Sequence, residues 1–118
     1  KILLRRAFRE ITELMCQSTL SWRSTPDDRA CEQEVNEQTK ALPISLVDGR
    51  IQDQVDRQME TDELKDLYIQ FLVAQFGVVS RRFGRENAQQ SFGQVLRQLA
   101  PELQAVAKRH GLDQVSRN

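Results

Sequence analysis

The chain has 118 residues, enough for one domain that buries about two-thirds of the surface its unfolded form would expose. Its 17 basic and 17 acidic side chains balance, so net charge provides no general attraction to nucleic acid. The most apolar stretch, residues 64–79, is interrupted by polar residues and is too short to span a membrane. Residues 1–20 lack the continuous apolar core of a signal peptide, so we expect a cytoplasmic protein.

The charges are unevenly placed along the chain. Residues 27–66 carry twelve acidic and five basic side chains, whereas residues 1–26 and 67–118 both have a basic excess. Solvated helix faces are the simplest interpretation of this pattern. Internal charge complementarity, head-to-tail self-association and a bipolar binding surface are the alternatives.

The first predicted element is an amphipathic helix over residues 2–20. Its core-facing residues recur at the i, i+3, i+4, i+7 spacing of one helix face. They are Leu4, Ala7, Phe8, Ile11, Leu14, Met15 and Ser18. Polar residues, including Arg5, Arg9 and Glu13, occupy the other side, so only one face of this helix is expected to meet the core.

A second helix is predicted from Pro26 to about Leu42. Thr25 can cap its free N–H groups, proline suits the first helical position, and two aspartates follow near the positive end of the helix dipole. Pro43 ends the helix, because the residue before a proline disfavours helical geometry. The apolar face is thin, so this helix is expected to cover one side of the core.

Residues 43–59 allow two interpretations. The Asp-Gly pair at 48–49 lies between short apolar segments, a pattern typical of a hairpin turn. Three later apolar residues nevertheless recur at i, i+4 and i+8, a spacing that a helix accommodates. These residues are Ile51, Val55 and Met59. We therefore predict a loop followed by a short helix over residues 50–59.

The next predicted helix contains the most apolar stretch of the chain and ends near Phe83, where Gly84 can take a left-handed conformation. Thr61 begins it as a cap. Its main apolar stripe comprises Leu64, Leu67, Tyr68, Phe71, Leu72, Val78 and Val79. A second stripe lies on another side and comprises Ile69, Val73 and Phe76. Such a helix must be covered by the chain's other helices or by a second copy.

The last helical stretch, about 86–110, carries the most regular apolar stripe. Its members are Ala88, Phe92, Val95, Leu96, Leu99, Leu103, Val106 and Ala107. Pro101 removes a hydrogen bond and clashes with the preceding turn, so we expect a kink or break at Ala100. Gly111 ends the helix. Residues 113–118 are expected to be a disordered tail behind a single helical domain of residues 1–112.

Together these elements predict an all-α fold, a compact bundle of five to six helices. The two long helices, about 62–83 and 86–110, are joined by a tight turn at Gly84 and are therefore expected to be antiparallel. Because the apolar face of the second helix is thin, we expect that it cannot fully bury the second apolar stripe of the 62–83 helix. A homodimer is the commonest way to complete such cover.

Few residues are suited to catalysis or metal binding. Cys16 and Cys31 are too few for a disulfide framework or a zinc site; we expect buried free thiols, with a bridge between neighbouring helices as the alternative. The single histidine, His110, falls in the last turn of a helix, where the dipole favours a cation. Carboxylates at helical spacing, such as Asp53 with Asp56, lack the paired histidines of a bundle metal site. We expect no enzymatic activity, catalytic residue, metal or cofactor.

Residues 74–92 show a degenerate helix-turn-helix pattern. Gly77 follows a small residue by three positions instead of the usual four, and Gly84 would interrupt the recognition helix. Basic residues available for phosphate contact are Arg81, Arg82 and Arg85. A DNA-binding transcriptional regulator is therefore an alternative function.

The leading interpretation is a regulator or inhibitor that binds another protein and forms a homodimer, with no membrane association. Small helical proteins without catalytic groups can act by covering a partner's surface. The predicted partner or dimer interface comprises Trp22, Ile69, Val73, Phe76 and Phe83. Trp22 stands alone in a polar linker, and tryptophan is enriched at interface hot spots. Packing of Trp22 onto its own core is the alternative.

Overall fold

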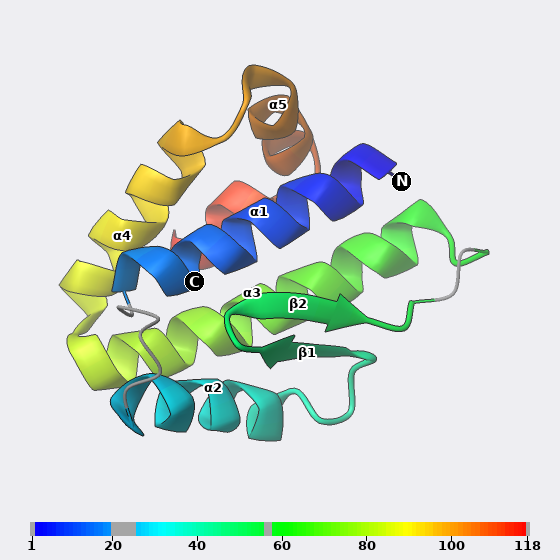
Figure 1. Cartoon of the computed structure of the whole chain (residues 1–118). Coiled ribbons are helices and arrows are strands. Elements are labelled where there is room, and N and C mark those ends of the chain that lie inside the picture. Colours follow the sequence, from blue (N-terminus) through cyan, green and yellow to red (C-terminus); the bar gives the residue numbers. More distant parts are fainter. Residues whose placement is uncertain (1, 20–25, 56–57, 118) are drawn as a thin grey trace.

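The computed structural model describes residues 2–19, 26–55 and 58–117, which are mostly helical (Figure 1). The elements are α1 (Ile2–Thr19), α2 (Pro26–Gln38), β1 (Ile44–Val47), β2 (Arg50–Asp53), α3 (Thr61–Phe83), α4 (Arg85–Gln98), α5 (Pro101–Arg109) and a 3₁₀ helix, η1 (Leu112–Arg117). A radius of gyration of 13.2 Å matches a compact domain of this length. The prediction of a compact helical fold is confirmed, with a small β-hairpin added to it. Within the described residues, no helix is both long and apolar enough to cross a bilayer.

Helix α1 lies at the centre of the fold. In Figure 1, α4 and α5 lie above it, the hairpin lies in front of α3, and α2 lies below. The Phe8 ring is fully buried and stacks on Tyr68, with 4.0 Å between centroids and 7° between planes. The edge of Phe71 meets the same ring at 5.7 Å. These contacts join α1 to α3 at the middle of the core.

The polar side of α1 faces the hairpin. The Arg5 guanidinium donates to the Val55 carbonyl oxygen at 3.1 Å, and Arg9 donates to the Asp53 carboxylate at 3.2 Å. The Asp53 side chain is only 5% exposed, so this ion pair is largely shielded from water on one side. The predicted one-faced helix therefore meets protein on both faces, because its polar residues find polar partners in β2 and the segment after it.

Residues 44–53 form an antiparallel hairpin in which Leu46 lies opposite Ile51. The turn residues Asp48 and Gly49 have φ of 52° and 79°, the positive values that a two-residue hairpin turn demands. The prediction of a loop followed by a helix over 50–59 is wrong here. A spacing of four residues fits both helical and strand periodicity, so the apolar pattern from Ile51 onward did not discriminate between them.

Side chains from two helices bind the outer edges of the hairpin. The Asn36 amide of α2 donates to the Leu46 carbonyl oxygen and accepts from the Leu46 N–H, both at 2.8 Å. Glu13 of α1 accepts from the Ile51 N–H at 3.3 Å. Glu32 of α2 accepts from both turn N–H groups, at 3.2 Å and 3.1 Å. An isolated two-stranded hairpin is marginal in water, so these contacts supply the partners that further strands would otherwise provide.

The predicted helix breaks at glycine and proline agree with the structure. α3 ends before Gly84, which has a φ of 91°, and α4 begins immediately after it. α4 ends at Gln98, and Pro101 is the first residue of α5. At the first position of a helix the backbone N–H makes no intrahelical hydrogen bond, so its absence in proline costs nothing there. α2 ends at Gln38, earlier than predicted. The buried Thr39 hydroxyl donates to the Val35 carbonyl oxygen at 2.9 Å, and the chain then turns with the Leu42 N–H bound to the Thr39 carbonyl oxygen at 2.8 Å.

The predicted disordered tail differs from the structure, since residues 112–117 form η1. Gly111 has a φ of 77° and reverses the chain, after which Leu112 and Val115 are buried at 0% and 2% exposure. A spacing of three residues puts both side chains on the same side of a 3₁₀ helix. η1 packs against α3, α4 and α5, and Gln89 of α4 donates to the Ser116 carbonyl oxygen at 3.1 Å.

We predict that Phe8→Ala lowers the free energy of unfolding by about 3–5 kcal/mol. The change removes a buried aromatic side chain and leaves a cavity that the surrounding core cannot fully close. Urea denaturation followed by circular dichroism measures the change. Ile2→Ala on the same helix serves as control, since Ile2 is 77% exposed and its truncation should change stability by less than about 0.5 kcal/mol. Equal losses for the two variants would contradict the central place of Phe8.

We predict that Asn36→Ala destabilises the fold by about 1–3 kcal/mol, because Leu46 loses the partners of both its outward backbone groups. Amide hydrogen exchange should accelerate first in β1 and β2. Gln33→Ala changes an exposed residue of the same helix and is the matched control. Unchanged exchange of the hairpin amides in Asn36→Ala would show that the edge contact does not hold the hairpin.

Candidate interaction surface

The predicted interface on α3 is covered in large part by the chain itself. Phe76 is 6% exposed, and its ring meets Phe92 of α4 edge to face at 6.0 Å. Ile69 is partly buried beside Gly111, where the chain turns into η1. Val73, at 42% exposure, is the outermost member of this second stripe. The solvent exposure of the side chains therefore rises from Phe76 through Ile69 to Val73, because α4 and η1 cover the stripe from one side.

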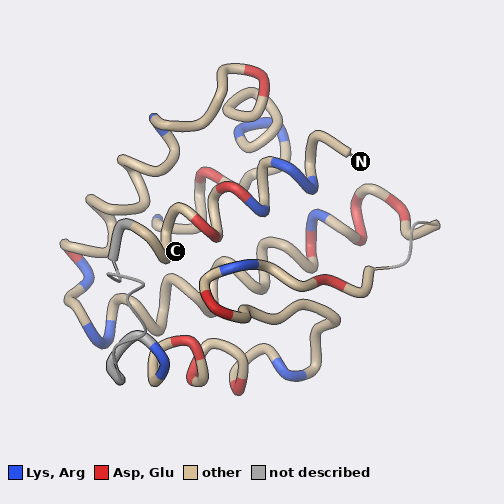
Figure 2. The backbone as a smooth tube through the Cα atoms, viewed as in Figure 1, with Lys and Arg blue, Asp and Glu red and all other residues tan. Residues whose placement is uncertain are grey.

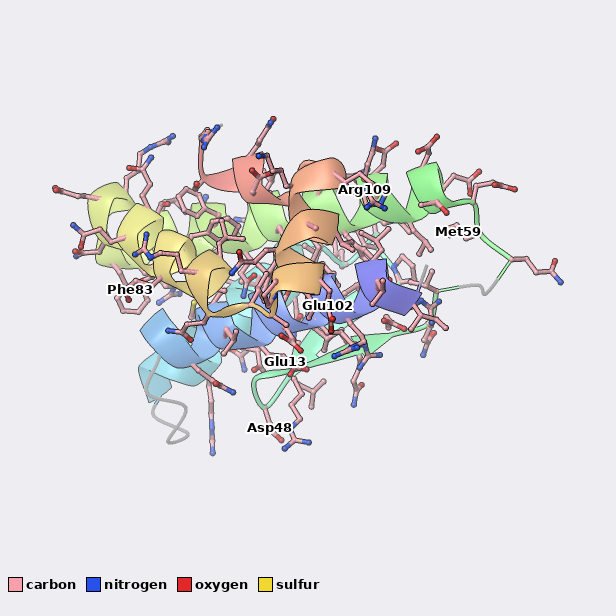
Figure 3. All side chains as sticks on the ribbon, turned by 90° about the horizontal axis from the view of Figure 1, so that it is seen from above. Glu13, Asp48, Met59, Phe83, Glu102 and Arg109 are labelled. Atoms are coloured by element: carbon pink, nitrogen blue, oxygen red, sulfur yellow. The ribbon has the colours of Figure 1, made fainter. Side chains whose placement is uncertain are left out.

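The remaining predicted interface residues are Phe83 and Trp22. Phe83 is 36% exposed at the end of α3, and Figure 3 shows it at the end of the molecule away from Arg109. Trp22 lies outside the described residues. That these residues form a partner or dimer interface stays a prediction. Of those on α3, only Val73 and Phe83 are exposed enough to contribute apolar contacts to it.

The three arginines proposed for phosphate contact are all exposed around the Gly84 corner. Arg81 and Arg82 lie 3.4 Å and 3.5 Å from the same carboxylate oxygen of Glu34 in α2. Figure 2 shows acidic residues of α2 beside this basic end of α3. A helix-turn-helix motif would place its turn at Gly77, but α3 continues through this residue. The chain turns at Gly84 instead. DNA contact stays a prediction, and Glu34 reduces the positive charge available for it.

Among the described residues, the large apolar side chains left exposed are Ile2, Leu3, Val47, Val73 and Phe83. Scattered single apolar residues are normal on protein surfaces. Ile2 and Leu3 differ from the other three because they are adjacent, at 77% and 44% exposure, in the first turn of α1. They also border a groove, so this end of the molecule is the strongest candidate for a binding surface.

The groove lies between the first turn of α1 and the last turn of α5 and has a volume of about 390 Å³. Its lining comprises Ile2, Leu3, Leu4, Val106, Arg109 and His110. Leu4 and Val106 are nearly buried, at 2% and 5% exposure, whereas Arg109 is exposed. The fold brings these segments together because α5 packs against α1. The result is an apolar groove with basic and imidazole side chains on the α5 wall.

His110 behaves differently from the sequence-based expectation of a helix-terminal cation. Burial lowers the pKa of His110 from its ordinary value of 6.5, and the positive charges of Arg109 and Lys65 lower it further. Asp62 acts in the opposite direction. At neutral pH the imidazole is therefore mainly uncharged, and Arg109 is the permanent charge among the groove-lining residues.

Comparison of the chain with protein-family models, curated proteins and solved structures found no match.

The cysteines and carboxylates offer no comparable site in the described parts of the chain. Cys16 and Cys31 are both buried and unbridged, and the Gln75 amide donates to the Cys16 sulfur at 3.3 Å. Burial raises the pKa of the Cys16 thiol far above its ordinary value, so little reactive thiolate forms there. Among the described residues, no group of three histidine, cysteine or acidic side chains is placed to hold a metal ion.

Sequence reasoning missed the groove, although one signal for it was present. Residues 2–4 are three consecutive apolar residues at the start of a helix, and one helix face cannot bury all three. Only Leu4 belongs to the core stripe, so Ile2 and Leu3 had to lie at its margin. The α5 wall, more than a hundred residues away in the sequence, carried no comparable signal.

We predict that His110 titrates with a midpoint below 6.5 in the folded chain. The unfolded chain takes up this proton at higher pH, so the contribution of His110 to stability is present above pH 6.5 and is lost as the pH falls through its lower folded pKa. NMR of the imidazole protons measures the midpoint. Asp62→Asn should lower the midpoint further and Arg109→Gln should raise it, whereas a midpoint above 6.5 in the unmodified chain would contradict this assignment.

Proposed function

We propose that this chain is a non-enzymatic protein-interaction module, a regulator or inhibitor that binds another protein through the groove between α1 and α5. The observation that supports it is the exposed pair Ile2 and Leu3 beside the nearly buried floor formed by Leu4 and Val106. Removing apolar surface from water contributes about 25 cal/mol per Å² buried, so a partner that covers this pair gains binding energy.

A macromolecular partner suits this surface better than a small ligand. A volume of about 390 Å³ is at the lower end of the range for small-molecule pockets. Ile2, however, is 77% exposed at the rim, and a molecule confined to the groove would leave most of it in water. A partner surface that enters the groove and extends over the rim would cover both Ile2 and the floor.

Homodimerisation and a cytoplasmic location are part of the same proposal. Val73 and Phe83 are the apolar side chains of α3 that the described chain leaves exposed, and they provide candidate dimer contacts. Buried cysteines without a bridge accord with a reducing compartment. The groove and these α3 residues are separate surfaces, so partner binding does not depend on the dimer.

We predict that affinity capture from the source cells retains a protein partner, and that the double change Ile2→Ser and Leu3→Ser abolishes its retention. Val47→Ser, which removes a similarly exposed apolar side chain from β1, is the matched control and should retain the partner. Circular dichroism verifies that all variants fold, and sedimentation equilibrium measures their association. Identical capture by the groove variant would contradict the proposal, and a monomer at every concentration would remove the dimer from it.

A further inference from the structure

We infer that the groove between α1 and α5 recognises an acidic amphipathic helix of the partner protein. This inference rests on the proposed function and adds to it the chemistry and secondary structure of the partner. The shape of the groove, the charge around it and the bound edges of the hairpin all favour this occupant.

The walls of the groove favour a helix as its occupant. Two helix ends form them, because Ile2, Leu3 and Leu4 come from the start of α1 and Val106 from the last turn of α5. Apolar anchors at i, i+3 and i+4 on a partner helix can enter such a groove together. A helix also extends beyond the groove and can therefore cover the rim residue Ile2.

Strand addition is disfavoured by the way the hairpin is held. An extended peptide that joins a sheet needs unpaired N–H and C=O groups along an edge strand. On β1, both outward groups of Leu46 are bound to Asn36, and on β2 the Ile51 N–H is bound to Glu13. These helix side chains occupy the positions where a partner strand would pair.

The charge around the groove favours an acidic partner. None of the six described residues that line it is acidic, and Arg109 contributes an exposed guanidinium. Figure 2 shows basic residues in the last turn of α5 near the start of α1, and acidic residues in the first turn of α3 at the same end of the molecule. Asp62 acts on His110 from the first turn of α3, but Lys65 on the same helix acts in the opposite direction. Glutamates flanking the partner's apolar stripe would meet Arg109.

Two synthetic peptides of about five helical turns test the inference. Both carry leucine at i, i+3, i+4 and i+7 spacing; one has glutamate and the other lysine at the flanking positions. NMR of the isotope-labelled chain should show that the glutamate peptide shifts amide signals in the first turn of α1 and the last turn of α5. Its affinity should fall as salt is raised, because the attraction includes exposed charges. The lysine peptide should bind at least about tenfold more weakly.

Charge-reversal variants make the test specific. Arg109→Glu should weaken binding of the glutamate peptide by about tenfold and strengthen that of the lysine peptide. Arg97→Glu changes an exposed arginine of α4 that does not line this groove, and it should leave both affinities nearly unchanged. Both residues are on the surface, so the NMR spectrum of each variant should remain that of the folded chain.

Two results would overturn the inference. Equal binding of the two peptides, or shifts confined to another surface, would show that the groove does not select acidic helices. If a captured partner still depended on Ile2 and Leu3, the proposed function would stand and only the partner chemistry would be wrong. If neither peptide bound and the groove variant captured the same proteins, both proposals would fail.

Discussion

The burial of α1 between the remaining elements is the constraint on which this structure depends. Phe8 stacks on Tyr68 and meets the edge of Phe71, so the middle of α1 is held in an aromatic cluster away from water. A helix enclosed on several sides must also find partners for its polar side chains. Arg9 finds its partner in Asp53 of β2, and Arg5 finds one in the Val55 carbonyl oxygen just beyond that strand. These contacts place the two strands against α1. The polar face of α1 therefore positions the sheet.

The hairpin in turn determines which kinds of contact the surface can offer. Asn36 binds both outward backbone groups of Leu46, Glu32 binds the two turn N–H groups, and Glu13 binds the Ile51 N–H. The helices thus protect the two-stranded sheet at these positions. Ion pairs from Asp53 to Arg9 and from Glu34 to Arg81 also join the acidic middle of the sequence to its basic ends. Internal complementarity thus accounts for part of the uneven charge, and the groove between α1 and α5 keeps Arg109 near the exposed Ile2 and Leu3.

The candidate site shows why surface function was harder to predict than helix content. The second apolar stripe of α3 correctly indicated burial on more than one side, but its cover comes from α4 and from η1 within the same chain. Val115 could not reveal this role, because a single apolar residue in the short segment 113–118 is compatible with a free tail. Conversely, the groove joins Ile2 and Leu3 to Arg109 and His110, and no local pattern relates residues so distant in the sequence.

The sequence by itself determined the helical character and several helix boundaries, because these depend on local backbone restrictions. Pro26 and Pro101 begin helices where a missing N–H is harmless, and Gly84 allows the positive φ between α3 and α4. Tertiary structure decided the strand conformation around Ile51, the order of the tail and the choice of α1 as the central helix. Each of these depends on which distant surfaces cover an apolar residue or bind an unpaired backbone group, and the sequence pattern alone does not contain that information.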